Sequence, residues 1–419
     1  MADIMIIKKR TTCRICGSRN LVDIMSLGEQ YIVNFVDSKK DKSNKAPLDL
    51  VMCTISDGGC GLLQLKHTFD HDILYNKYWY RSSTSTTMIK ALNEIVASAT
   101  QIIDLKEGDI VVDIGANDGT LLLQYTNKDI IKVGYEPSNL WEYGNKQGLK
   151  IIHDYFNAVS FEKQFDEKKA KIITSIAMFY DLDDPNKFVA DIKKCLDPNG
   201  IWIIQMNYLG TMLENNTFDN ISHEHLEYYS FSTLEYLLNK YELEAFDIEL
   251  NNVNGGSFRI YIKNKDSLVN SKEGKKHLKE IREYEAKKRL ESKETYEEFA
   301  KRISNIKNKL VTILKEEKAK GKKIFIYGAS TRGLVVLQYM GITNTLIEAA
   351  VDKNPDKWGK YIVGTNIPII SLEEYRKDKP DYLFVLPYHF LPEIMEQEKE
   401  FLNKGGKMIV AIPSVKVIK

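Results

Sequence analysis

Residues 220–230 hold the densest group of side chains that could move a proton. His223, Glu224 and His225 are consecutive, and they include two of the seven histidines in the chain. Histidine titrates near neutral pH and can remove a proton there, and an adjacent carboxylate can orient it and favour its charged form. A structural hydrogen-bond cluster or a metal site is also consistent with these residues, although H-E-H lacks the one-turn ligand spacing of H-E-x-x-H peptidases. We favour a general base because of the domain that precedes this segment.

Four of the five cysteines lie within the first sixty residues. Cys13 and Cys16 form a C-x2-C pair, whereas Cys53 and Cys60 have six residues between them; a glycine follows Cys16 and Cys60 and permits tight turns. Tetrahedral zinc would supply on the order of 10 kcal/mol of folding energy to a loop-rich segment with little core of its own. Four thiolates leave no open coordination position, so we predict structural zinc, with free thiols or redox work as alternatives. Cys195, in a predicted helix, is interpreted as a packed thiol.

Residues 109–120, DIVVDIGANDGT, run from an apolar strand into a G-x-x-x-G turn and then a helix. The glycines remove side chains where the backbone must approach a ligand. The turn lacks both the GK[ST] of a phosphate loop and the G-x-G-x-x-G of a dinucleotide site. The next strand ends at Glu136, whose carboxylate can accept hydrogen bonds from ribose hydroxyls. A dinucleotide-binding or ligand-free unit is the alternative, but the two features together resemble class I S-adenosylmethionine (SAM)-dependent methyltransferases.

This resemblance and the topology rule that ligands bind beyond the carboxyl ends of parallel strands predict the SAM contacts. The expected cofactor-binding residues are Asp113, Gly115, Asn117, Gly119, Glu136, Pro137, Phe156, Asn157, Ala177 and Met178.

The surrounding elements are predicted to hold these residues in an α/β fold. Apolar residues recur at helical spacing over residues 73–107, and strands then alternate with helices to about residue 265, which indicates a mostly parallel sheet. Residues 271–320 are rich in Lys and Glu with one apolar stripe, as expected of a solvated helix that bridges two domains. From Lys322 a second α/β unit begins, and GGKMIVAIP is its expected final strand.

Length and charge limit the possible functions. The 419 residues suit two or three domains. With 59 Lys and Arg against 58 Asp and Glu, the chain has no general attraction for nucleic acid. No uncharged apolar run is long enough to span a bilayer, and the N-terminal apolar stretch is too short for a signal peptide. We therefore expect a cytoplasmic monomer or small homo-oligomer that binds neither nucleic acid nor membrane.

Across nearly its whole length the sequence resembles the three-domain sugar C-methyltransferases, which methylate C3 of nucleotide-linked 4-keto-deoxysugars. The motifs that carry the resemblance are CRICGS at Cys13, CGLLQL at Cys60, YWYRS at Tyr78, DIGANDG, HEHLEYYS, NGGSFR at Asn254, GASTRG at Gly328 and PYHF at Pro387. It implies a zinc-binding domain (1–72), a central SAM domain (73–268) and a helical linker with a Rossmann-like domain (269–419). The sugar nucleotide is expected between the last two.

The resemblance also implies roles for individual residues. His225 would be the base and Glu224 its supporting acid, with His223 beside them, and Tyr78 or Tyr80 would position the sugar or steady the enolate. The family often has a tyrosine where this chain has Ser222, and its second cysteine pair is usually closer.

The remaining predicted contacts concern the substrate. The turn at Ser330, Thr331 and Arg332 presents N–H groups, hydroxyls and a guanidinium at a helix N-terminus, which suits phosphate, although a plain strand–helix turn is the alternative. Asn207 and Tyr229 are also expected to contact the substrate. The rival functions are an O- or N-methyltransferase acting on another small metabolite and a non-catalytic binding protein.

Overall fold

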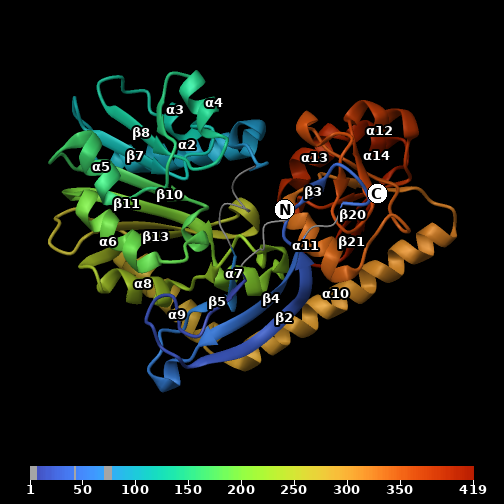
Figure 1. Cartoon of the computed structure of the whole chain (residues 1–419), viewed down its shortest axis with the longest axis horizontal. Coiled ribbons are helices and arrows are strands. Elements are labelled where there is room, and N and C mark those ends of the chain that lie inside the picture. The colour runs from blue at the N-terminus through green and yellow to red at the C-terminus, as the bar shows by residue number, and fades with distance from the viewer. Residues whose placement is uncertain (1–6, 42–43, 70–77) are drawn as a thin grey trace.

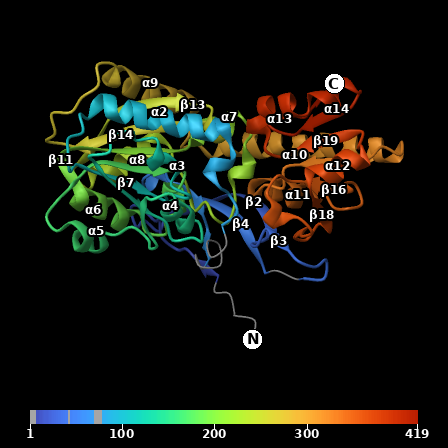
Figure 2. The ribbon, with the colours of Figure 1, turned by 90° about the horizontal axis from the view of Figure 1, so that it is seen from above.

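The computed structural model describes residues 7–41, 44–69 and 78–419. Two large sheets with their helices lie side by side, and a long N-terminal hairpin lies below and between them (Figure 1). Seen from above, helix α2 (Thr86–Ile102) lies along the first sheet (Figure 2). Its buried side chains belong to the core on one face of this sheet, whereas those of α9 (Gly274–Lys288) belong to the core on the other face. Within these residues, no helix combines the length and the low polarity needed to traverse a bilayer.

The first sheet has seven strands in the order β13-β14-β11-β10-β7-β8-β9. Its strands are β7 (Ile110–Ile114), β8 (Ile131–Tyr135), β9 (Lys150–Ile152), β10 (Ala170–Ile176), β11 (Leu196–Asn207), β13 (Leu243–Asn251) and β14 (Ser257–Asn264). Strands β7 to β11 pair in parallel, and β14 and β13 add an antiparallel edge. The predicted mostly parallel α/β sheet is confirmed.

The helices of this part follow the strands in the expected alternation. They are α3 (Thr120–Leu123), α4 (Trp141–Lys146), α5 (Ala158–Phe165), α6 (Pro185–Cys195), α7 (Leu209–Glu214) and α8 (Phe231–Asn239). Helix α2 precedes them, with the side chain of Ser85 accepting from the Met88 N–H as its cap. Its buried face includes Leu92, Ile95 and Val96, so the predicted helical period is confirmed.

The second sheet has eight strands in the order β21-β20-β19-β15-β16-β18-β17-β3. Its strands are β15 (Ile324–Tyr327), β16 (Ala349–Val351), β17 (Tyr361–Ile362), β18 (Ile367–Ile370), β19 (Tyr382–Val385), β20 (Lys407–Val410), β21 (Lys416–Ile418) and β3 (Phe35–Val36). The helices are α11 (Thr331–Met340), α12 (Leu372–Asp378), α13 (Leu391–Gln397) and α14 (Lys399–Asn403). Strand β20 was expected to be the last, but antiparallel β21 follows it.

The N-terminal segment has more regular structure than the sequence suggested. Strands β2 (Leu21–Tyr31) and β4 (Lys45–Cys53) form a long antiparallel pair, so the expectation of a loop-rich segment with little core is wrong. Strand β4 also pairs with β5 (Leu63–Leu65), which pairs with β12 (Glu227–Tyr228) from the middle of the chain, while β3 joins the second sheet. Strand pairing therefore ties this segment to both larger parts.

The Lys- and Glu-rich stretch forms two helices rather than the single one expected. Helix α9 ends at Lys288, its cap Arg289 has a left-handed backbone with φ 51°, and α10 (Lys293–Ala319) follows. The apolar stripe of α10 is buried against the N-terminal hairpin and the second sheet, because Phe299, Ile303 and Leu310 belong to the same core as β4 and β15 residues. Burial of this stripe helps to fix the second sheet relative to the rest, together with the pairing of β3.

We expect Phe299→Ala to lower the free energy of unfolding by about 3–5 kcal/mol, since it leaves a cavity where a fully buried ring packs. Urea denaturation would measure the loss. The neighbouring Glu298 is exposed on the same helix, and Glu298→Ala should leave the midpoint almost unchanged. Equal effects of the two changes would contradict the packing role assigned to the α10 stripe.

Candidate active site

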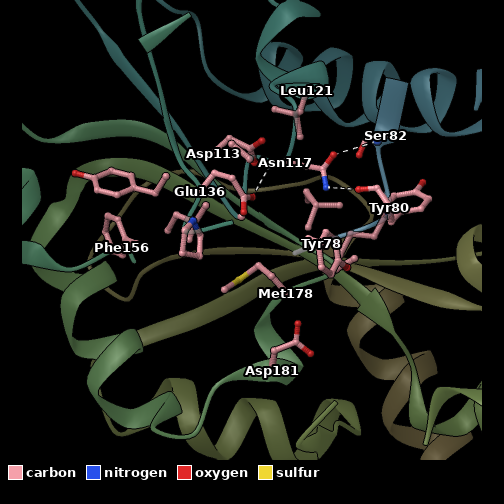
Figure 3. A pocket seen from close by; sticks show the side chains of 18 of the residues that line it. Tyr78, Tyr80, Ser82, Asp113, Asn117, Leu121, Glu136, Phe156, Met178 and Asp181 are labelled. Atoms are coloured by element: carbon pink, nitrogen blue, oxygen red, sulfur yellow. Dashed lines mark hydrogen bonds between the residues drawn. The ribbon is translucent and has the colours of Figure 1, made fainter. Parts of the chain in front are cut away.

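A cavity of about 300 Å³ opens at the carboxyl ends of β7, β8 and β10. Figure 3 shows Asp113, Asn117 and Glu136 on one side of it and Tyr78 and Tyr80 on another. The predicted cofactor residues that line it are Asp113, Gly115, Asn117, Glu136, Pro137, Phe156, Ala177 and Met178. Eight of the ten residues expected from the sequence therefore meet around one space.

Glu136 lines this cavity and is hydrogen-bonded to the glycine turn. Its carboxylate accepts hydrogen bonds from the backbone N–H of Asn117 at 2.7 Å and of Ser138 at 2.9 Å. Asn117 is left-handed, with φ 54°, and this conformation aims its N–H at Glu136. Gly115 is also left-handed, and a Cβ there would lie 3.0 Å from Met178. The turn is thus shaped to bring backbone and carboxylate to one ligand.

The charge of the cavity distinguishes between its possible ligands. Five carboxylates line it, and among the described lining residues there is no Lys, Arg or His. The five are Asp113, Glu136, Asp154, Asp181 and Asp183. Such a field favours a cationic ligand and opposes the diphosphate of a dinucleotide. Burial raises the pKa of Asp113 to about 7, although the Thr174 hydroxyl donates to it at 2.6 Å, and a bound cation would favour its charged form.

The loop that carries Tyr78 and Tyr80 is held on the glycine turn by side chain–backbone hydrogen bonds. Asn117 accepts from the Ser82 N–H at 3.1 Å and donates to the Tyr80 carbonyl oxygen at 3.0 Å (Figure 3). Asp118 accepts from the next N–H along this loop at 3.0 Å. Both tyrosines consequently lie where the first cavity meets a second one.

The second cavity, of about 170 Å³, lies between the two large sheets. It shares Tyr78, Tyr80, Ala177 and Asn254 with the first cavity. Its wall also contains the predicted residues His223, Glu224, His225, Asn207, Ser330, Thr331 and Arg332, together with Ser222. The glycine turn and the His-Glu-His segment, about a hundred residues apart in sequence, therefore face adjoining spaces.

His225 is held as a neutral imidazole. Its Nδ1 donates to the Asn220 carbonyl oxygen at 2.7 Å, and the Tyr180 ring packs 4.3 Å from its own ring, centroid to centroid. This bond leaves the lone pair on Nε2. Burial, followed by the positive charge of Arg332, lowers the pKa of His225 to about 3, so the ring is unprotonated at neutral pH. The group that orients His225 is thus a carbonyl, and not Glu224 as the sequence had led us to expect.

The two neighbours of His225 have separate environments. Glu224 bonds to Asn34, and burial raises the pKa of its carboxyl group to about 7. His223 bonds through Nε2 to the Ala46 carbonyl oxygen at 3.1 Å, and its ring meets Phe69 edge-on at 4.8 Å. Burial lowers the pKa of His223 to about 4. His223 therefore connects this segment to the N-terminal hairpin, while Glu224 lines the second cavity.

Three predicted contacts have other positions in the structure. Asn157 caps α5 by accepting from the Ser160 N–H at 2.8 Å. The three residues before it, 154–156, line the cavity instead. Gly119 begins α3 with φ 81° and shapes the turn without lining the cavity. Tyr229 is fully buried against Phe179 and is absent from the walls of both cavities. A strand or turn position alone does not tell which side chains reach the ligand space.

Arg332 is already paired, which corrects its assignment as a free phosphate ligand. Its Nη2 lies 2.7 Å from the Asp219 carboxylate, and its Nη1 donates to the Asn254 carbonyl oxygen at 2.8 Å. Ser330 caps α11 by accepting from the Gly333 N–H at 3.0 Å. Asp219, Tyr180 and His389 also line this site; only His389 lies in a motif noted in the sequence.

A third cavity, of about 300 Å³, adjoins the second at the N-terminus of α11. The two share Tyr80, Ser330, Thr331, Pro387 and Phe390. Its wall includes Arg81, Lys353, Lys357 and Asp352. The three cavities form a row, and Tyr80 lines all of them.

The four N-terminal cysteines converge as predicted. Their sulfur atoms all lie within 4.8 Å of one another, with Cys13–Cys60 and Cys16–Cys53 at 3.5 Å. Zn–S bonds of about 2.3 Å in a tetrahedron put sulfurs roughly 3.8 Å apart, so the donor set fits structural zinc. A Cβ at Gly59 would lie 2.4 Å from the Cys53 sulfur, so the wide second loop closes only because glycine stands there.

The sheet, the acidic first cavity and the cysteine cluster define a SAM-dependent methyltransferase with a structural zinc site. Three family models match in order: "Putative zinc binding domain" at residues 13–75, "Methyltransferase domain" at 80–247 and "C-methyltransferase C-terminal domain" at 252–413. The chain is 30% identical to the C-methyltransferase NovU of Streptomyces niveus over 99% of its own length and 98% of that protein. It belongs to this family of C-methyltransferases.

Solved structures of methyltransferases match part of the chain at low identity. A SAM-dependent methyltransferase from Clostridium acetobutylicum is 13% identical, with a TM-score of 0.34, and the match covers 42% of this chain and 92% of that one. The plantazolicin methyltransferase BpumL in complex with S-adenosylhomocysteine is 14% identical, with a TM-score of 0.35, covering 43% and 84%.

Metal analysis should find about one zinc per chain, as a four-thiolate site binds one ion. Cys16→Ser should lose the metal and lower the melting temperature, because the metal supplies folding energy to the N-terminal segment. Cys195→Ala is the matched control, since this buried thiol lies outside the cluster. Full zinc content in Cys16→Ser would contradict the assignment.

Glu136→Gln should weaken SAM binding about 10- to 100-fold, the usual loss for one hydrogen bond to a charged group. Isothermal titration calorimetry would measure the dissociation constant. Glu142 is exposed on the following helix, and Glu142→Gln should bind SAM normally. An unchanged affinity in Glu136→Gln would rule out a ribose contact at this carboxylate.

Proposed function

We propose that the protein methylates C3 of a nucleotide-linked 4-keto-deoxysugar, using His225 as the base that forms an enolate. The observation that carries this proposal is the row of three adjoining cavities. The first is acidic and suits the cationic methyl donor, the second contains a neutral imidazole, and the third begins at a helix N-terminus.

The second cavity provides what a carbon acid needs. A ketone at C4 acidifies the C3–H bond, and the Nε2 lone pair of His225 accepts that proton. The Tyr78 hydroxyl can donate a hydrogen bond to the enolate oxygen, since burial and then the charge of Glu224 raise its pKa and keep it protonated. Tyr78 lies in the wall common to both cavities, so a carbanion formed there faces the methyl-donor space.

When bound in the first cavity, SAM supplies an electrophilic methyl group on a positively charged sulfur. Asp113 and Glu136 would hold its nucleoside end, and the Gly115 turn leaves room for its backbone contacts. Holding donor and sugar in adjoining cavities removes much of the entropic barrier to their reaction.

The third cavity suits the nucleotide end of the substrate. The N-terminus of α11, with the hydroxyl groups of Ser330 and Thr331, offers backbone N–H groups to a diphosphate. Lys353 and Arg81 add positive charge to this space, in contrast to the acidic first cavity. Asp352, at the tip of β16, stands where a ribose could be held, as Glu136 does in the first sheet.

His225→Asn should slow methyl transfer and proton exchange about 10²- to 10⁴-fold, the usual contribution of a positioned base. The substrates would be 4-keto-deoxysugars linked to thymidine, uridine, cytidine and guanosine diphosphate, incubated with labelled SAM. Mass spectrometry would locate the methyl group, and NMR in heavy water would follow deuterium entry at C3. SAM affinity should not change.

His277→Asn is the matched control, since His277 lies on α9 and pairs with Asp247 away from the cavities. It should retain full activity. A methyl group found on oxygen or nitrogen would favour the rival O- or N-methyltransferase, and an active His225→Asn would end the proposed mechanism.

A further inference from the structure

A buried ion pair joins the two large parts of the molecule beside His225. Asp219 lies in the short turn Phe218–Asn220 and is 2% exposed, while Arg332 lies in the first turn of α11. Arg332 Nε and Nη2 lie 2.9 Å and 2.7 Å from the same Asp219 oxygen. Removing two charges from water is costly and often brings no net stability, so a buried pair in a cavity wall needs a further explanation.

The pair is held by further contacts from both sides. Arg332 Nη1 donates to the Asn254 carbonyl oxygen at 2.8 Å, and Nη2 donates to the Tyr388 hydroxyl at 3.2 Å. The same hydroxyl donates to Asp219 at 3.3 Å. A Cβ at Gly255 would lie 2.8 Å from the Tyr388 hydroxyl, so this close packing requires glycine. The guanidinium therefore has one defined orientation.

The anchored turn includes the group that orients the base. Asn220 directly follows Asp219, and its carbonyl oxygen accepts from His225 Nδ1 at 2.7 Å. A shift of the turn would move this carbonyl and rotate the imidazole. We propose that Arg332 and Asp219 are positioning residues, which hold the 218–220 turn from across the domain interface and thereby fix the ring of His225. The inference rests on the proposed function in that it takes His225 as the base.

This arrangement links the base to the helix end where the substrate's nucleotide is proposed to bind. Arg332 directly follows Thr331, which lines both the second and the third cavity. The part of the protein that grips the substrate therefore also carries the residue that holds the base in place. Arg332 acts through Asp219, which explains why its guanidinium is paired and not open to a phosphate.

Arg332 also acts on His225 through its charge. Its positive charge lowers the pKa of His225 in addition to the effect of burial. His225 lines the second cavity and a smaller space next to it. The other titratable or charged side chains that line these two spaces are Tyr31, Tyr78, Tyr80, Tyr180, Tyr208, Asp219, His223, Glu224, Glu227, Tyr228 and His389. Removing the charge of Arg332 should raise the pKa of His225 toward its ordinary value. A base must be neutral, so activity would then be lost at a higher pH as the solution is acidified.

The test compares Arg332→Gln, Asp219→Asn and the double variant. The measurement is deuterium entry at C3 of thymidine diphosphate-linked 4-keto-deoxysugar with S-adenosylhomocysteine bound, together with the affinity for S-adenosylhomocysteine. Each single change should slow exchange about 10- to 100-fold without changing that affinity, since a misplacement near 1 Å costs rates of this order. The double variant should be no slower than the slower single variant, because both residues act through one contact.

The pH profile separates positioning from general damage. Arg332→Gln should shift the acid limb to higher pH, whereas Arg332→Lys keeps the charge and should keep the limb near its original place even if exchange is slower. Asp219→Asn should not shift it upward. If Arg332→Gln loses S-adenosylhomocysteine binding through misfolding, Arg332→Lys and Asp219→Asn still decide the question.

Arg302→Gln is the matched control. Arg302 lies on α10 and bonds to the segment just before the 218–220 turn. It donates to the Asn216 side chain at 2.8 Å and to the Leu213 carbonyl oxygen at 2.6 Å, but it does not line the second cavity. It should keep the wild-type rate and pH profile. Wild-type exchange in both single variants, or equal losses in Arg302→Gln, would overturn the inference. An active His225→Asn would instead refute the proposed function.

Discussion

The arrangement of the cavities depends on one contact, which holds the loop of Tyr78 and Tyr80 against the glycine turn of the methyltransferase domain. The side chains of Asn117 and Asp118 each accept from a backbone N–H of this loop, and Asn117 also donates to the Tyr80 carbonyl oxygen. They place Tyr78 and Tyr80 in the wall between the first and second cavities. The same Asn117 supplies its N–H to Glu136, so the turn that shapes the donor site also fixes the boundary of the second cavity.

Charge is distributed unequally along the row of cavities. The first is lined by carboxylates, which suits a cationic donor, and the third contains cationic side chains that suit a phosphorylated ligand. Between them, burial keeps His225 neutral and able to accept a proton. A folded chain with a formal net charge of only +1 thus contains one cavity lined by carboxylates and another that contains three cationic side chains.

Besides its cysteine cluster, the N-terminal segment supplies packing and strand pairing to both larger parts of the molecule. Its hairpin shares one core with α10 and the second sheet, and its strand β5 pairs with β12, only two residues after His225. His223 bonds to the hairpin at Ala46. The zinc-binding part therefore supports the segment that carries His225, which gives a physical reason for its presence in a methyltransferase.

The sequence by itself determined the alternating strands and helices, the four-cysteine cluster, the glycine turn and Glu136, because each depends on local spacing or on a regular topology. It did not reveal that α10 is separate from α9, that Tyr229 and Asn157 point elsewhere, or that Asp219 pairs with Arg332. Those features depend on side-chain packing between residues far apart in the chain, such as the 113 positions that separate Asp219 from Arg332. Only the tertiary structure decides which partner a buried charge finds, since its pairing energy depends on the surrounding desolvation and geometry.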